Sequence, residues 1–236
     1  RRDTCVLAPT DSGAVTRSED LVIHGRVRGA SNHTFYATLG EEQVPVVYKP
    51  IRGEQPLWDF PDGKLAYREY AAFLVSEAIG WHLIPPTWIT DGPHGEGMVQ
   101  HWVDSDPSRK RSRSSRPGRF PPGYLSVFDG VDGEDRPVTL VHEDSEALRR
   151  IALLDIIINN ADRKGGHILE GPGGGRFGID HGIAFHHQPK LRTVLWGWAG
   201  TPLTDEEVRD VRTLRARLDG DLGDELGFWL TTPDLE

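Results

Sequence analysis

The sequence Asn159-Asn160-Ala161-Asp162-Arg163-Lys164-Gly165-Gly166-His167-Ile168-Leu169 is the segment around which the other parts of this chain can be arranged. It follows an apolar run at residues 151–158, which predicts a buried helix because apolar side chains cover nearly its whole circumference. After a glycine-rich turn comes Gly178-Ile179-Asp180-His181-Gly182. The polar loop that carries Asp162 therefore lies between a buried helix and a second aspartate.

Two short strand-like segments, residues 167–170 and 176–180, flank the glycine-rich turn and predict a β-hairpin. The hairpin would bring Asp162 and Asp180 side by side. Phosphoryl transfer needs two such carboxylates, because one orients the attacking hydroxyl and the other holds the metal that neutralises the phosphate oxygens. The pair indicates a kinase, although either aspartate alone is equally typical of an ordinary turn.

Composition limits the other possibilities. The chain has 236 residues, of which 37% are hydrophobic and 27% charged, which is enough for one large domain or two lobes. The net charge of -9 gives no reason to expect a nucleic-acid partner. A single cysteine, Cys5, excludes an internal disulfide framework and fits a cytoplasmic location. No apolar run approaches the roughly twenty residues of a membrane span, so we expect no stable membrane insertion.

In the first part of the chain, apolar and polar residues alternate as expected for the strands of an antiparallel β-meander. Residues 21–28 and 34–39 predict a hairpin, and residues 44–49 predict a third strand. Small residues at the hairpin tip allow backbone N–H groups to approach a nucleotide phosphate, and we expect this of Gly29, Ser31 and Asn32. An ordinary hairpin turn is the alternative for such a loop.

Lys49 closes the third strand, where a kinase keeps the cation that holds the nucleotide phosphates. Residues 64–79 predict a helix, and Glu69 within it is the candidate partner that fixes Lys49. The alternative is a solvent-exposed lysine, with a glutamate that pairs locally with Arg68 or Lys64.

A strand predicted at residues 97–103 would lead out of a small β-rich lobe that we place at residues 18–103. In a kinase this strand runs into the hinge, where backbone groups meet the adenine edge. The residues concerned are Gln100, His101, Trp102 and Val103. A core strand that carries an aromatic residue is an equally good interpretation.

A mostly helical lobe is expected at residues 104–236, and a flexible arm at residues 1–17. The basic segment near residues 108–119 has low complexity and no apolar period, which predicts a flexible insert. A solvated surface insert is favoured over an anion-binding loop. Likewise, the cationic segment 186–192 could receive an anionic acceptor, while the tryptophans that follow it are more typical of packing anchors.

The order of these parts resembles the phosphatidylinositol 3/4-kinase superfamily, in particular type II phosphatidylinositol 4-kinases, HipA-like kinases and a group of short actinobacterial proteins. The resemblance spans residues 21–198 and is strongest at residues 159–185. It implies an α+β, two-lobed protein-kinase-like fold with ATP in the cleft. By the family pattern Lys49 would bind phosphates, oriented by Glu69, Asp162 would be the catalytic aspartate, and Asp180 would ligate the metal.

One residue departs from that pattern, because His167 stands where the family has an asparagine as second metal ligand. Magnesium prefers oxygen donors, whereas an imidazole suits manganese and later metals better. We therefore expect ATP with Mg²⁺ or Mn²⁺ as cofactors, and phosphoryl transfer to a hydroxyl of a small molecule or protein, including the chain itself. A degenerate nucleotide-binding pseudokinase that acts as a scaffold, and an AMP transferase, are the alternatives.

Overall fold

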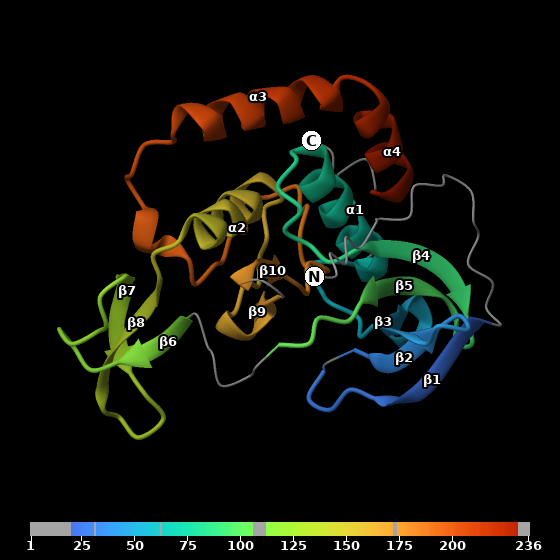
Figure 1. The fold of residues 1–236 in the computed structure, drawn as a ribbon, viewed down its shortest axis with the longest axis horizontal. Helices are drawn as coiled ribbons and strands as arrows, with labels where there is room; N and C mark the ends of the chain where they lie inside the picture. The colour runs from blue at the N-terminus through green and yellow to red at the C-terminus, as the bar shows by residue number, and fades with distance from the viewer. Residues whose placement is uncertain (1–19, 31, 62, 106–111, 172–173, 231–236) are drawn as a thin grey trace, which may run out of the picture.

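The computed structural model describes residues 20–30, 32–61, 63–105, 112–171 and 174–230. It shows the predicted α+β, two-lobed kinase-like architecture, with a five-stranded sheet on one side and helices with two smaller sheets on the other (Figure 1). The residue boundaries assigned to the lobes stay a prediction, and the expected arm at residues 1–17 lies outside the described residues.

The sheet of the small lobe is entirely antiparallel, in the order β1-β2-β3-β5-β4. Its strands are β1 (Leu21–Arg26), β2 (Phe35–Leu39), β3 (Val44–Pro50), β4 (Thr87–Gly92) and β5 (Gly95–His101). Lys49 on β3 pairs with Met98 on β5. Beside this pair, a Cβ atom at Gly97 would lie 2.4 Å from the Lys49 carbonyl oxygen. Only glycine therefore allows the two strands to approach so closely next to Lys49.

Helix α1 (Leu65–Ala78) forms close to the predicted position and lies between the sheet and the other helices (Figure 1). It begins after Lys64, which has a left-handed backbone, and ends before Gly80, whose φ is +80°. Its buried Ala71, Ala72 and Val75 join the main hydrophobic core. This packing fixes the helix face that carries Glu69.

The helices of the large lobe are α2 (Glu146–Ile157), α3 (Asp205–Leu218) and α4 (Asp221–Trp229). A capping box starts α3, because Thr204 Oγ1 accepts from the Glu207 N–H and Glu207 Oε2 accepts from the Thr204 N–H. Ser145 occupies the N-cap position of α2, but its hydroxyl makes no capping bond.

The hairpin after the Asp162 loop consists of β9 (Ile168–Glu170) and β10 (Arg176–Gly178), paired antiparallel as predicted. Short 3-10 turns occur at η2 (Ile51–Gly53), η3 (Gly165–His167) and η5 (Trp196–Trp198). The hairpin lies below α2 in the centre of Figure 1. It thus connects the helical core to the region between the lobes.

A three-stranded sheet, which we call the accessory sheet, projects from the large lobe (Figure 1). Its strands are β6 (Ser112–Ser115), β7 (Tyr124–Val131) and β8 (Pro137–Glu143), in the order β6-β8-β7. The expectation of a flexible insert near residues 108–119 was wrong for residues 112–115, because backbone pairing with β8 makes them a strand. Residues 106–111 lie outside the described residues.

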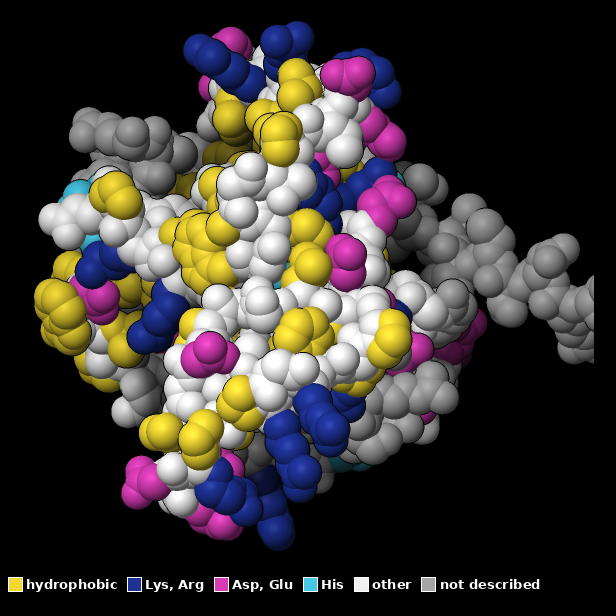
Figure 2. All heavy atoms as spheres, turned by 90° about the vertical axis from the view of Figure 1, so that its left-hand side faces the viewer, with side chains coloured by type: hydrophobic (Ala, Val, Ile, Leu, Met, Phe, Trp, Pro, Cys, Tyr) yellow, Lys and Arg dark blue, Asp and Glu magenta, His cyan; other side chains and the backbone are white. Residues whose placement is uncertain are grey.

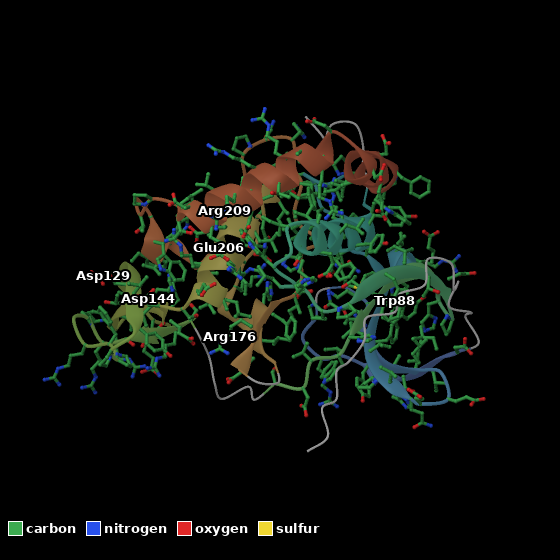
Figure 3. The ribbon with its side chains drawn as sticks, turned by 45° about the horizontal axis from the view of Figure 1, so that its top comes forward. Trp88, Asp129, Asp144, Arg176, Glu206 and Arg209 are labelled. Atoms are coloured by element: carbon green, nitrogen blue, oxygen red, sulfur yellow. The ribbon has the colours of Figure 1, made fainter. Side chains whose placement is uncertain are left out.

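The accessory sheet contacts the Asp162 loop and the β9–β10 hairpin. Ser112 is buried and packs closely against Gly165. A Cβ atom added at Gly165 would lie 3.2 Å from the Ser112 Cβ. Arg176, labelled in Figure 3, reaches from β10 to Glu143 on β8 at 3.2 Å. Figure 2, which looks onto this side of the molecule, shows exposed hydrophobic side chains among both acidic and basic ones.

Bilayer-spanning helices are not found in the described ranges, since none of their helices combines the required length with sufficient apolar character.

Candidate active site

Lys49 lies at the centre of a charged cluster between the lobes. Its Nζ is 2.7 Å from Glu69 Oε1 on α1 and also donates a hydrogen bond to Asp180 Oδ1, just after β10. The Lys49 side chain is only 16% exposed, so it does not extend into solvent. The structure thus brings together three residues that are 20 and 131 positions apart in the sequence.

Burial and charge act in opposite directions on this cluster. Burial by itself would lower the pKa of Lys49 and raise that of Asp180, because it disfavours the charged forms. The carboxylates outweigh burial at Lys49 and raise its pKa, and the ammonium group holds the pKa of Asp180 at about 2. Burial raises the pKa of Glu69 in spite of Lys49. Lys49 and Asp180 are therefore an ionised pair at neutral pH.

Asp162 lies on a tight turn, where its backbone N–H donates to Asn160 Oδ1 at 3.1 Å. Two cations hold its carboxylate: Lys164 Nζ is 2.6 Å from Oδ2, and Arg192 Nη2 is 2.8 Å from Oδ1. The Asp162 side chain is 15% exposed, whereas those of Lys164 and Arg192 are 63% and 75% exposed. The carboxylate is thus oriented by groups that are themselves open to solvent.

A buried ion pair beneath this turn holds the loop in place. Arg163 and Asp155 on α2 both have fully buried side chains, and Arg163 Nη2 is 2.8 Å from Asp155 Oδ1. Arg163 also donates to the carbonyl oxygens of His167 and Ile179 and to His181 Nε2. One guanidinium group therefore connects α2, the Asp162 loop and the segment that carries Asp180.

A second arginine connects α1 to that segment. Arg68 Nη1 donates to the carbonyl oxygens of Ala184 at 2.7 Å and Phe185 at 3.1 Å. A Cβ atom at Gly182 would lie 3.2 Å from the Leu65 Cβ, so the segment packs directly on the helix. The relative position of Glu69 and Asp180 is consequently fixed by backbone contacts as well as by Lys49.

His167 and Asp180 are the predicted metal ligands. His167 Nε2 is 3.4 Å from Asp180 Oδ2, and its buried Nδ1 has no partner among the described residues. Burial lowers the pKa of His167, so its imidazole is neutral at neutral pH and has a lone pair for a metal. The described ranges contain no group of three or more His, Cys, Asp or Glu that could hold an ion. These two donors fit an ion whose other ligands are phosphate oxygens and water.

Two cavities adjoin at Lys49. A cavity of about 260 Å³ has mainly apolar walls, including Val27, Val47 and Ile179. A second, of about 310 Å³, is more polar. Both are lined by Ala30, Thr34, Lys49 and Asp180.

The predicted site residues are distributed between these cavities. Gln100, His101, Trp102 and Val103 line the first cavity. Gly29, Asn32, Glu69, Asp162 and His167 line the second. Ser31 lies outside the described residues. The structure therefore brings the other predicted residues together around one continuous space, while their roles stay predictions.

The hinge offers fewer free groups than the sequence indicated. The N–H groups of His101 and Trp102 donate to the carbonyl oxygens of Pro86 and Pro45. The buried Gln100 side chain donates to Thr87. The Val103 N–H has no hydrogen bond to another described residue. The Val103 N–H is therefore a donor that a base edge could use.

Sequence reasoning missed Asp155, His181 and Arg68, and it considered Arg192 only as part of the cationic segment 186–192, without its contact to Asp162. A signal existed for Asp155, since it is a carboxylate within an otherwise apolar helix, and such a group requires a buried partner. The contact of Arg192 with Asp162 had no signal, because the two residues meet through a parallel bridge between Arg163 and Thr193. A contact between segments so far apart in the chain leaves no local sequence pattern.

Comparison with known proteins gives a near match and more distant, partial ones. No protein-family profile matches the chain. It is 49% identical to protein Rv2133c of Mycobacterium tuberculosis over 227 residues, which cover 92% of this chain and 82% of that protein. It is 31% identical to phosphatidylinositol 4-kinases gamma 7 and gamma 6 of Arabidopsis thaliana, over 68% and 64% of this chain. The chain spans about a quarter of the length of these plant proteins, namely 25% and 26%.

Proposed function

We propose that this chain, which belongs to the family of Mycobacterium tuberculosis protein Rv2133c, is an ATP- and divalent-metal-dependent kinase that phosphorylates a hydroxyl acceptor. The observation that carries the proposal is the position of Lys49, which contacts both Glu69 and Asp180 where the two cavities join. The partial similarity to proteins named phosphatidylinositol 4-kinases supports the same activity.

In this proposal the nucleotide occupies both cavities. The adenine would lie in the apolar cavity and accept a hydrogen bond from the free Val103 N–H. The phosphates would extend into the polar cavity, where Lys49 neutralises part of their charge. Glu69 would hold the ammonium group of Lys49 in position for this contact.

Asp162 would orient the acceptor. The hydroxyl oxygen attacks the γ-phosphorus while the bond from this phosphorus to the β–γ bridging oxygen breaks, and ADP leaves with the bonding electrons. The hydroxyl proton passes to the Asp162 carboxylate. The ion pairs with Lys164 and Arg192 hold this carboxylate in one orientation.

Asp180 and His167 would hold a divalent ion, Mg²⁺ or Mn²⁺, together with phosphate oxygens. When bound, such an ion neutralises charge on the phosphate oxygens. The carboxylate of Asp180 is ionised, since its pKa is about 2, and His167 is neutral. Both groups are therefore in the protonation state that ligation requires.

Thermal shift with ATP and metal tests the binding step. ATP with Mg²⁺ or Mn²⁺ should stabilise the protein, because a ligand that binds only the folded state adds stability by mass action. Asp180→Asn should lose the metal-dependent part of the shift. Asp219→Asn, an exposed aspartate at the end of α3, is the matched control and should keep it. A wild-type protein that neither metal stabilises together with ATP would refute the proposal.

Mass spectrometry separates phosphoryl transfer from the alternatives. Incubation of the protein with ATP, metal and a hydroxyl acceptor should yield a product that gains a phosphate. A gain of AMP would indicate nucleotidyl transfer, and ATP binding without turnover would indicate a scaffold. Asp162→Asn should lower the rate of transfer by about 10²- to 10⁴-fold, the usual range for loss of a general base.

A further inference from the structure

Arg192 is fixed to the Asp162 loop by its backbone and its side chain. Its N–H donates to the Asn160 carbonyl oxygen at 2.9 Å, and its own carbonyl oxygen accepts from the Arg163 N–H at 3.0 Å. Its side-chain Nε donates to the Ala161 carbonyl oxygen at 2.9 Å, and Nη2 contacts Asp162. Despite these contacts the side chain is 75% exposed. The guanidinium is therefore held in place while part of it faces solvent.

The two cations on Asp162 contact different oxygens of its carboxylate. Lys164 lines the polar cavity together with Lys49 and Asp180, so it faces the proposed phosphate site. Arg192 contacts the other carboxylate oxygen and is not among the residues that line that cavity. Because the nucleotide would occupy the cavity, the acceptor has to reach Asp162 from outside it, and there it meets Arg192.

Among the residues that the structure describes, no acidic group other than Asp162 pairs with Arg192. Lys190, two residues earlier, is paired with Asp59 at 3.1 Å and packs over the Trp58 ring. Of these two cations, Arg192 is therefore the one that supplies positive charge beside Asp162.

We infer that the acceptor is an anionic alcohol, with a phosphate or carboxylate group close to the hydroxyl that is phosphorylated, and that Arg192 selects it. This inference rests on the proposed kinase activity. An anion that approaches Asp162, Asp180 and the phosphates of ATP is repelled by all of them unless a cation compensates. A guanidinium suits this role because its planar donors match the oxygens of a phosphate or carboxylate.

The test compares hydroxyl acceptors with and without an anionic group. Transfer from ATP is measured to glycerol, glycerate and glycerol 3-phosphate, and to phosphatidylcholine vesicles with and without phosphatidylinositol. The wild-type protein should prefer the anionic members. Transfer to the vesicles but not to the soluble compounds would identify a lipid headgroup as the source of the anion. Transfer to the soluble compounds but not to the vesicles would identify a soluble metabolite.

Substitutions at Arg192 test whether this residue causes the preference for anionic acceptors. Arg192→Gln should raise KM for the anionic acceptor by roughly 10- to 100-fold, the usual value of a charged hydrogen bond, without a matching rise in KM for the neutral one. Loss of its contact with Asp162 should instead lower kcat for both acceptors alike. Arg192→Lys should restore part of the preference, because it keeps the charge and loses the planar geometry. Arg136→Gln is the control, since Arg136 is 66% exposed and paired with Asp132 in the turn between β7 and β8.

The outcomes separate this inference from the proposed function. ATP consumption that shows no preference for anionic acceptors, or an equal change in Arg136→Gln, would overturn the role of Arg192. Consumption of ATP without transfer to any anionic member would also overturn it. A wild-type protein that neither binds nor consumes ATP would instead overturn the kinase proposal, which the thermal-shift measurement shows before any acceptor is added.

Discussion

The buried pair of Asp155 and Arg163 gives the sharpest prediction about stability. Asp155→Asn keeps the shape of the side chain and removes its charge, so the perturbation is electrostatic and creates no cavity. Arg163 would remain fully buried without its carboxylate partner. Thr193 Oγ1 and Asn160 Nδ2, which also donate to Asp155, would face a weaker acceptor.

The expected loss is large. Removal of one partner from a buried ion pair costs about 3–5 kcal/mol, because the other charge stays buried and uncompensated. Three nitrogen–oxygen contacts of 2.8 to 3.1 Å join Arg163 to Asp155, which supports a value within this range. For a chain of this size the melting temperature should fall by roughly 6–20 °C.

Circular dichroism during thermal unfolding measures the shift. Glu206→Gln is the matched control, since Glu206 at the start of α3 (Figure 3) pairs with Arg150 at 2.9 Å and is 59% exposed. An exposed pair contributes about 0–1 kcal/mol, so the control should change little. If Asp155→Asn and Glu206→Gln lower the melting temperature equally, the argument that Arg163 depends on Asp155 is refuted.

Three further predictions concern other parts of the structure. Gly97→Ala should reduce both stability and the ATP-induced thermal shift, because the new Cβ would lie 2.4 Å from the Lys49 carbonyl oxygen and separate β3 from β5. The free energy of unfolding should decrease as pH falls below about 6.5, because burial lowers the pKa of His142 and the unfolded state then binds more protons; His142→Gln should show a smaller pH slope in denaturant titrations. His167→Asn should shift metal preference from Mn²⁺ toward Mg²⁺ in the ATP thermal shift, and an unchanged preference would remove His167 from the metal site.

The elements around Lys49 could be predicted because local patterns agree with the tertiary structure there. Alternation marks β3, an apolar face marks α1, and the glycine-rich turn marks the β9–β10 hairpin. The order of these elements then placed Lys49, Glu69 and Asp180 close to one another. Their contacts follow from topology, which the sequence pattern indicated correctly.

Strand β6 could not be predicted, because Ser112–Ser115 contains no apolar residue and its structure depends on pairing with β8. The same limit applies to the role of Arg192, whose position depends on a bridge between segments 30 residues apart. The predicted hinge is a third feature that local sequence pattern indicated only in part. Its strand was predicted, but the sheet bonds that occupy the N–H groups of His101 and Trp102 were not.

The contact between Lys49 and Asp180 makes nucleotide binding an exchange of partners. Any phosphate that binds Lys49 has to compete with the Asp180 carboxylate, which already accepts a hydrogen bond from it. A divalent ion that takes over this carboxylate releases the ammonium group for the phosphate. Metal and ATP would therefore strengthen each other's binding by the same factor, as thermodynamic linkage requires. Asp180→Asn should correspondingly bind ATP more tightly than wild type when no metal is added, since it removes the competitor.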